Sequence, residues 1–221
     1  MARLIFDLDG TLVHSAPTMT AAANTLLAEL GRPPLTESRV LAFVGQGMRR
    51  LVERMLDATG GAPGGDATLQ FQRYRAIYSA DPLTGTVPYP GVRTALARLA
   101  AAGHGLAVCT QKADAPSLAI LRGLALMPPV SGFTGGDSLD VLKPDPAMLR
   151  HAADQLPPGP VMMIGDSETD AATAAAAGVP FLLHLNGYNH RAPETLGAAA
   201  TFAAFADLPD LVAALLAAGT R

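Results

Sequence analysis

Residues 4–12 have the sequence LIFDLDGTL, and this stretch decides the fold. Its apolar start is typical of a buried strand in a parallel sheet. The strand leads into Asp7 and Asp9, whose Cα atoms would lie roughly 6.5 Å apart on one side of an extended chain. An Asp-Gly pair is also a common turn, so a plain strand end followed by an exposed turn is the alternative. The rest of the chain decides between the two.

The composition indicates a globular protein. With 221 residues, of which 49% are hydrophobic, the chain can bury a sizeable core. Its net charge of −3 gives no general attraction to nucleic acid, and no apolar run reaches the length of about 18 residues that predicts a membrane span. A cytoplasmic location is expected, because the first residues lack the basic and apolar parts of a signal segment. The single cysteine, Cys109, excludes an internal disulfide and a cysteine-based zinc site.

The residues after the first strand predict a small helical unit. Apolar residues recur there with the spacing of one helix face, and Pro17 suits the first turn of the first helix. Helices are expected over residues 16–30, after Thr36, over 48–56 and over 71–78. We therefore predict a helical cap domain of residues 16–82, inserted into a core made of residues 1–15 and 83–221.

From Val92 onward the pattern alternates between helix and strand. Strands are expected over residues 105–109, 130–133, 161–164 and 179–183, with helices between them and a last helix around residues 211–216. This order predicts an α/β fold, with a Rossmann-like three-layer core whose mainly parallel sheet is covered on both faces. Ligands of such sheets bind beyond the carboxyl ends of the strands.

That rule brings polar residues from separate strand ends to one edge of the sheet. Besides the two aspartates, Thr110 follows one strand, and the segment GDSETD, residues 165–170, follows another. Lys143 precedes a proline, which disfavours helix and leaves this lysine on an extended segment. Only two of the 16 basic residues are lysine, which favours a specific role for Lys143. Lys112 suits a phosphate contact and a solvated surface position equally well.

A site with so many carboxylates requires a cation. Two ionised carboxylates about 4 Å apart repel each other by roughly 4 kcal/mol at an effective dielectric constant of 20, and up to four converge here. An all-oxygen set with neither cysteine nor a histidine pair favours Mg²⁺, which usually retains water and substrate phosphate. A phosphate ligand would explain Thr110 as a hydroxyl donor and Lys143 as a positive charge.

Taken in order, these segments resemble a known superfamily. DLDGTL (7–12), Thr110, Lys143-Pro144 and GDSxxD (165–170) resemble the four motifs of the haloacid dehalogenase (HAD) superfamily of phosphohydrolases. The helical insertion is similar to that superfamily's type C1 cap. Three further segments resemble the phosphoglycolate phosphatases of this superfamily: FVGQG (43–47), PYPGV (88–92) and NGYN (186–189).

The resemblance implies a role for each motif residue. Asp7 would be the nucleophile that forms an aspartyl-phosphate, and Asp9 the general acid and base. Asp170 also suits a helix-capping box with Ser167, and both roles can hold together. The resemblance also implies that Asp7, the carbonyl of Asp9 and Asp166 hold Mg²⁺, with support from Asp170. Thr110 and Lys143 would hold the phosphoryl group. Gln111 departs from the family pattern, which commonly has Asn there, but a substrate contact through its backbone N–H would survive the change.

Substrate choice is expected to depend on the cap. The backbone of Gly45-Gln46-Gly47 could receive a carboxylate, and Arg49 and Arg50 lie in the first turn of the next helix. A small phosphorylated acid such as 2-phosphoglycolate suits this interpretation, although at least one of the two arginines could be a solvated surface residue. We hypothesise that replacing Arg49 or Arg50 by alanine raises KM for phosphoglycolate.

Other functions within the superfamily stay open. A sugar phosphatase, a pyrophosphatase or a phosphomutase would keep all four motifs, and a non-enzymatic phospho-ligand binding module is a further alternative. A dehalogenase would lack Asp9, and a phosphonatase would need a cap lysine, which residues 16–87 do not contain. His14 and His190 depart from the family pattern without an assigned role. The chain is expected to act as a monomer or homodimer.

Overall fold

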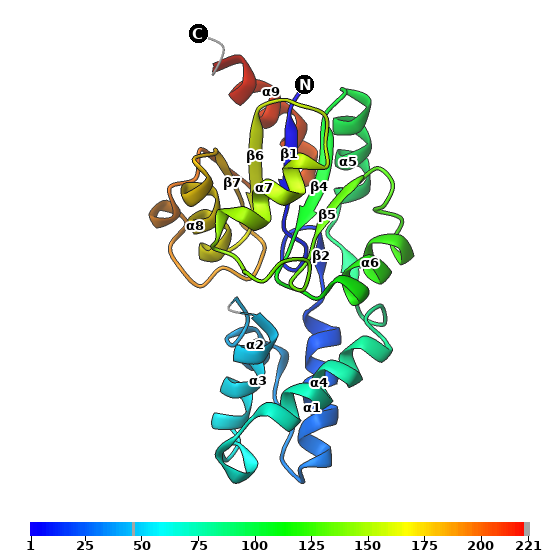
Figure 1. Ribbon diagram of the computed structural model, residues 1–221, viewed down its shortest axis with the longest axis vertical. Coiled ribbons are helices and arrows are strands. Elements are labelled where there is room, and N and C mark those ends of the chain that lie inside the picture. The colour runs from blue at the N-terminus through cyan, green and yellow to red at the C-terminus, as the bar shows by residue number, and fades with distance from the viewer. Residues whose placement is uncertain (46, 219–221) are drawn as a thin grey trace.

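The computed structural model describes residues 1–45 and 47–218, and its centre is a parallel sheet (Figure 1). The sheet has six strands in the order β5-β4-β1-β6-β7-β8, and each neighbouring pair is parallel. The strands are β1 (Arg3–Phe6), β4 (Gly105–Cys109), β5 (Gly132–Thr134), β6 (Val161–Gly165), β7 (Phe181–His184) and β8 (Ala200–Phe202). The first strand of the chain thus lies inside the sheet, between β4 and β6, and the predicted α/β fold class is confirmed.

Helices cover both faces of this sheet, which explains why its central strands are mainly apolar. Side chains of β1 alternate between the two layers: Leu4 and Phe6 pack on one side, and Ile5 on the other. The first layer contains α5 (Val92–Ala101), α6 (Asp114–Gly123) and α9 (Leu208–Ala218), and the second contains α7 (Pro146–Asp154) and α8 (Glu168–Ala177). Short 3₁₀ turns η2 (Pro193–Leu196) and η3 (Phe205–Asp207) complete the core.

Two strand boundaries differ from the prediction for a local reason. Val130 was placed in a strand, but its N–H donates to the carbonyl of Leu126 in a turn, so β5 begins only at Gly132. Val179 was also placed in a strand, but its N–H donates to the carbonyl of Ala174 and finishes the end of α8. In both cases an apolar side chain is buried or half-buried in a turn, which periodicity alone does not distinguish from a strand.

The inserted helices form a second body with its own apolar interior (Figure 1). They are α1 (Ala16–Glu29), α2 (Glu37–Leu41), α3 (Gly47–Asp57) and α4 (Thr68–Ala80), with the 3₁₀ turn η1 (Pro63–Gly65) between the last two. We call residues 16–82 the cap and the remainder the core. The chain passes between them through two short antiparallel strands, β2 (Val13–His14) and β3 (Val87–Pro88). Among the described residues, no helix has the length and apolar character needed to cross a membrane.

The start of α1 is capped from the core. The side chain of Ser15 makes no capping bond to this helix, because its hydroxyl donates to Asp9 instead. The hydroxyl of Tyr188, from the loop after β7, accepts the N–H groups of Ser15 and Ala16 at 2.8 and 3.1 Å. The first N–H groups of a helix have no partner within the helix, so Tyr188 satisfies them and joins core to cap.

Replacing Tyr188 by phenylalanine removes the acceptor of these two buried N–H groups. We expect the free energy of unfolding to fall by ~1–3 kcal/mol, because buried donors without a partner are costly. Urea unfolding followed by circular dichroism measures the change.

Tyr74→Phe is the matched control for this prediction. The Tyr74 hydroxyl donates over 3.3 Å to the carbonyl of Met19, which lies inside α1 and can also pair within the helix. Its loss is expected to cost less than ~1 kcal/mol. Equal losses in the two variants would contradict a capping role for Tyr188.

Candidate active site

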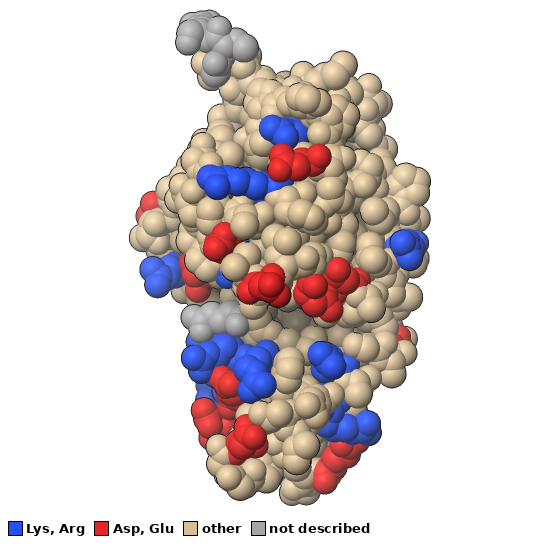
Figure 2. Space-filling model, in the orientation of Figure 1, with Lys and Arg blue, Asp and Glu red and all other residues tan. Residues whose placement is uncertain are grey.

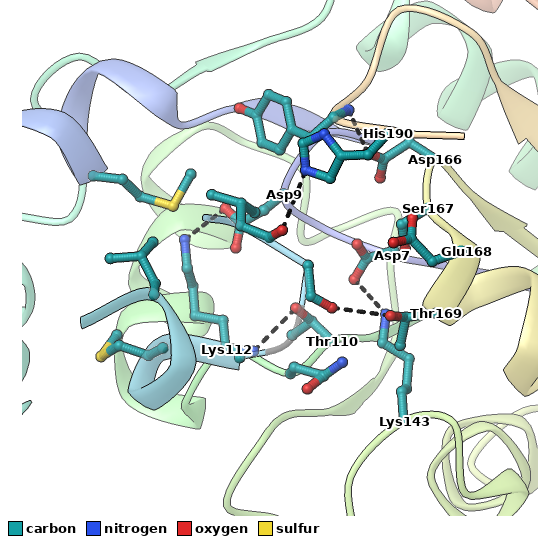
Figure 3. A pocket seen from close by; sticks show the side chains of 18 of the residues that line it. Asp7, Asp9, Thr110, Lys112, Lys143, Asp166, Ser167, Glu168, Thr169 and His190 are labelled. Carbon is teal, nitrogen blue, oxygen red and sulfur yellow. Dashed lines mark hydrogen bonds and ion pairs between the residues drawn. The ribbon is translucent and has the colours of Figure 1, made fainter. Parts of the chain in front are cut away.

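Three strand ends meet at the carboxyl edge of the sheet, facing the cap (Figure 3). Asp7 follows β1, Thr110 follows β4 and Asp166 follows β6. One ligand oxygen from each of Asp7, Asp166 and Asp170 can be chosen so that all three lie within 4.8 Å of one another, and all three residues are buried. The predicted convergence of these motif residues is therefore present in the structure.

Lys143 lies among these carboxylates. Its Nζ is 2.8 Å from Oδ1 of Asp7 and 2.6 Å from Oδ1 of Asp170, and its side chain is 3% exposed. Burial lowers the pKa of the lysine, but the charges of Asp170 and Asp7 outweigh this and raise it overall, so the ammonium stays charged. Its placement here, from a loop distant in sequence, excludes a solvated surface role.

The turn after β1 requires glycine at position 10. Gly10 has φ of +84°, and a Cβ atom there would lie 2.3 Å from Oδ2 of Asp166. The absence of a side chain lets the β1 loop and Asp166 approach each other. Asp166 is then fixed by two donors, the Thr11 hydroxyl at 2.7 Å and the Tyr188 N–H at 2.6 Å. Asp9-Gly10 is therefore a turn, as the alternative prediction had it. The turn is not exposed, however, because it lies against the buried carboxylate of Asp166.

Asp170 has the expected capping role and also contacts Lys143. Its Oδ2 accepts the N–H and hydroxyl of Ser167 in the capping box that begins α8. Its Oδ1 accepts the ammonium of Lys143. One carboxylate therefore starts a helix and also orients the charged group beside Asp7.

Asp9 is held by a separate set of partners. Its Oδ1 accepts the Lys112 ammonium at 2.6 Å and the Ser15 hydroxyl at 2.5 Å. Lys112 is buried, with 8% of its surface exposed, and it also donates to the hydroxyl of Tyr78 in α4 at 2.5 Å. The alternative of a surface position for Lys112 was wrong, because the residue connects Asp9 with the cap.

The carboxylates of Asp7, Asp166 and Asp170 carry more negative charge than the single ammonium of Lys143 can neutralise. Burial raises the pKa of Asp7 to about 7, against the lowering effect of Lys143 and with a further increase from the charge of Asp170. Burial and the charges of Asp170 and Asp7 likewise raise the pKa of Asp166 well above its usual value. Three hard oxygen donors with too little positive charge nearby suit a divalent cation.

The site opens into a cavity of about 100 Å³ between core and cap. Its core side contains Thr110 and Gln111 as well as the carboxylates of Asp7, Asp9, Asp166 and Glu168. Its cap side is formed by uncharged residues: Met19, Val44, Gly45, Gly47, Met48, Leu51, Tyr74 and Tyr78. Gln46, predicted to contact substrate, lies outside the described residues.

Two contacts hold the cap loop against the core beside this cavity. The Thr169 hydroxyl donates to the carbonyl of Gly45 at 2.9 Å, and Nε2 of His190 lies 3.3 Å from the carbonyl of Val44. His190 thus lines the cavity. His14 lies at the β2 crossing instead, where its Nδ1 is 3.2 Å from the Tyr188 hydroxyl.

Arg49 and Arg50 lie away from the cavity wall. Both pair with Glu53, at 3.9 and 2.8 Å, and the guanidinium of Arg49 lies over the ring of Phe71. Figure 2 shows basic and acidic side chains together on the exposed surface of the cap. The reason is the helix period: Met48 and Leu51 of α3 face the cavity, so the arginines between them face outward. The structure does not bring these two predicted residues to the site.

The site also contains residues that sequence reasoning did not single out. Ser15, Thr11, Tyr78 and Tyr188 bond directly to Asp9, Lys112 or Asp166. Thr11 lies within the first motif and Tyr188 within NGYN, so position in a motif was an available signal. No sequence signal marked Tyr78 as a site residue, because it continues the apolar face of the helix predicted over residues 71–78.

Comparisons with known proteins agree with this geometry. Residues 1–178 match the family model described as haloacid dehalogenase-like hydrolase, and the chain belongs to this family. It is 44% identical over 218 residues to the phosphoglycolate phosphatase of Cereibacter sphaeroides, covering 98% of this chain and 100% of that one. It is 45% identical over 214 residues to the phosphoglycolate phosphatase of Rhodospirillum rubrum, covering 94% and 89%.

A solved structure shows the same fold. The crystal structure of a predicted phosphoglycolate phosphatase from Haemophilus somnus superposes with a TM-score of 0.87 at 28% identity, covering 95% of this chain and 97% of that one. The superfamily resemblance derived from the four motifs is thereby confirmed.

The crowding of carboxylates has a consequence for metal-free protein. We expect Asp166→Asn to raise the melting temperature in EDTA at pH 8, because it removes one of three buried negative charges. The amide can keep both contacts, accepting the Tyr188 N–H and donating to the Thr11 hydroxyl. Scanning calorimetry measures the effect, with the exposed Asp154→Asn as a control that should change little.

The same experiment has a predicted pH dependence. The raised pKa values of Asp7 and Asp166 mean that the folded state binds protons more tightly than the unfolded state, so stability is lost as pH rises through these values, of which that of Asp7 is about 7. The advantage of Asp166→Asn should therefore be larger at pH 8 than at pH 5. A melting temperature of Asp166→Asn below that of wild type at both pH values would contradict the proposed repulsion among the three carboxylates.

Proposed function

We propose that this protein is a Mg²⁺-dependent phosphatase that hydrolyses 2-phosphoglycolate to glycolate and phosphate through an aspartyl-phosphate intermediate. The observation that carries the proposal is the buried Asp7 carboxylate, paired with Lys143 and opening into the same small cavity as Asp9. The names of the relatives from Cereibacter sphaeroides and Rhodospirillum rubrum support the choice of substrate.

Asp7 is the proposed nucleophile. Its Oδ1 is bonded to Lys143, so we assign the attack on phosphorus to its other carboxylate oxygen. A bond forms between that oxygen and phosphorus while the bond to the glycolate oxygen breaks, which divides one difficult displacement into two easier steps. Thr110 and Lys143 are assigned to the phosphoryl oxygens, where a hydroxyl donor and a fixed positive charge stabilise the developing negative charge.

Asp9 is the proposed acid and base. It would donate a proton to the departing glycolate oxygen and then accept a proton from the water that hydrolyses the aspartyl-phosphate. The Lys112 ammonium and the Ser15 hydroxyl both bond to its Oδ1, so its carboxylate is fixed in orientation within the cavity. The two aspartates of the first motif thus have different partners and different tasks.

The carboxylate cluster would hold the metal ion. Asp7, Asp166 and the backbone carbonyl of Asp9 are the proposed ligands, and Asp170 supports them through Ser167 and Lys143. We assign Mg²⁺ because the donors are all oxygen. When bound, this ion would offset the charge of the phosphoryl group and of the carboxylates around it.

The lining of the cavity favours a short phosphorylated acid over the alternatives considered for this superfamily. A cap side without charged groups among its described residues offers few partners for the hydroxyls of a sugar phosphate. Pyrophosphate carries a second phosphate group. Apart from Lys143, the only lysine among the described lining residues that could offset its charge is Lys112, and one ammonium is too little for that group.

A kinetic panel tests the function. In MgCl₂ we expect kcat/KM for 2-phosphoglycolate to exceed that for glucose 6-phosphate, pyrophosphate and p-nitrophenyl phosphate by at least ~10-fold, because their sugar, second phosphate and aromatic groups do not match the polar partners that line the cavity. Release of inorganic phosphate is the measurement. Preference for another member of the panel would replace the proposed substrate, and no turnover of any member would favour a phospho-ligand binding module.

Asp7→Asn tests the nucleophile. The amide keeps the shape of the side chain but attacks phosphorus poorly, so we expect kcat to fall by at least ~10³-fold. Arg50→Ala is the control: it removes a charge from the exposed face of the cap and should leave kcat within about twofold of wild type. Turnover by Asp7→Asn close to that of wild type would assign the nucleophile elsewhere.

A further inference from the structure

A substrate carboxylate in this cavity needs a positive partner, and the described cap residues do not supply one. The cap side of the cavity is uncharged in the described part of the chain, and the two arginines nearest in sequence pair with Glu53 on the outer face of α3. A buried carboxylate without a partner is costly. Among the described residues, the positively charged groups that line this cavity come from the core.

Two ammonium groups line the cavity within the described residues, those of Lys143 and Lys112. Lys143 lies at the Asp7 end, bonded to Asp7 and Asp170, where the phosphoryl group reacts. Lys112 lies at the cap end, bonded to Asp9 and to Tyr78 of α4 (Figure 3). The two positive charges are therefore divided between the two ends of the site.

Lys112 has bonding capacity left for a ligand. An ammonium group has three N–H donors, and Asp9 and Tyr78 accept two of them. The Tyr78 hydroxyl accepts from Lys112, so its own hydrogen is available to a further acceptor. One N–H and one O–H therefore lie side by side at the cap end, which suits the two oxygens of a carboxylate.

The covalent structure of 2-phosphoglycolate limits how far its carboxylate can lie from Asp9. To protonate the departing oxygen, Asp9 must come within about 2.6–3.2 Å of it. In 2-phosphoglycolate that oxygen is joined to the carboxylate through a single methylene group. The carboxylate must therefore lie close to Asp9, and Nζ of Lys112 is itself 2.6 Å from Asp9.

We propose that Lys112, together with the Tyr78 hydroxyl, binds the carboxylate of the substrate and selects short phosphorylated acids over neutral phosphoesters. This assignment rests on the proposed function and deepens it. It moves acid recognition from the cap arginines to a core lysine that is oriented by a cap tyrosine. A neutral phosphoester would leave these buried donors without an acceptor, which penalises its binding.

Binding of two inert analogues tests the proposal. 3-Phosphonopropionate has the chain length and carboxylate of phosphoglycolate, with a methylene in place of the bridging oxygen, and propylphosphonate lacks the carboxylate. In calorimetric titrations with MgCl₂, Lys112→Met should raise Kd for 3-phosphonopropionate by ~10- to 100-fold and Kd for propylphosphonate by less than about threefold. Tyr78→Phe should weaken 3-phosphonopropionate alone, by ~3- to 10-fold.

Binding of propylphosphonate also shows whether the phosphate site of each variant is folded. Arg49→Met is the matched control for Lys112→Met. That variant removes a cap charge outside the cavity and should leave both Kd values unchanged. Equal weakening of both analogues by Lys112→Met would mean that the lysine only orients Asp9, and unchanged binding of both would also overturn the proposal. Arg49→Met that selectively weakens 3-phosphonopropionate would return recognition to the cap.

The proposed function can fail separately from this inference. If wild type hydrolyses 2-phosphoglycolate no faster than the other panel members, the proposed substrate is wrong. A selective loss of 3-phosphonopropionate binding in Lys112→Met would still show that Lys112 reads a carboxylate, and the substrate would then be sought among other short phosphorylated acids. If wild type prefers phosphoglycolate but Lys112→Met binds both analogues normally, only the assignment of Lys112 fails.

Discussion

The ion pair of Lys143 with Asp7 and Asp170 is the interaction on which the rest of the structure depends. It places one positive charge among three buried carboxylates, at the edge where β1 and β6 end. Buried charges are tolerated only with close partners, so each neighbouring segment has to supply one. Ser167, Thr11 and the Tyr188 backbone do so, and Gly10 leaves the space in which Asp166 fits. The remaining excess of negative charge is what suits the site to a divalent cation.

A second pair, Lys112 with Asp9, connects this centre to the cap. Lys112 comes from the loop after β4, yet its ammonium also contacts Tyr78 of α4, and Ser15 at the entry to α1 donates to the same aspartate. Core and cap therefore meet at Asp9, the proposed general acid and base. The cap encloses the cavity with apolar and aromatic side chains, whereas the core supplies its charges. This division of tasks differs from the expectation that cap arginines recognise the substrate.

Much of the fold followed from local patterns. The strand over residues 105–109 matches the structure at both ends, because a short apolar run marks it clearly, and the capping box expected for Ser167 and Asp170 begins α8. Val130 and Val179 were misplaced, since each satisfies a turn or helix-end hydrogen bond that apolarity does not reveal. The short edge strand β8 and the β2–β3 pair were missed, because strands of two or three residues carry too little pattern.

The sequence by itself determined the class of fold, the order of the four motifs and the family to which they belong. It could do so because strand and helix periodicity and the spacing of motif residues are properties of neighbours along the chain. Only the tertiary structure decided which charges meet. Arg49 and Arg50 were predicted at the site but face outward, whereas Lys112, 103 positions from Asp9, is buried against it. Partner choice depends on contacts between distant segments, and burial makes those contacts obligatory for a charged group.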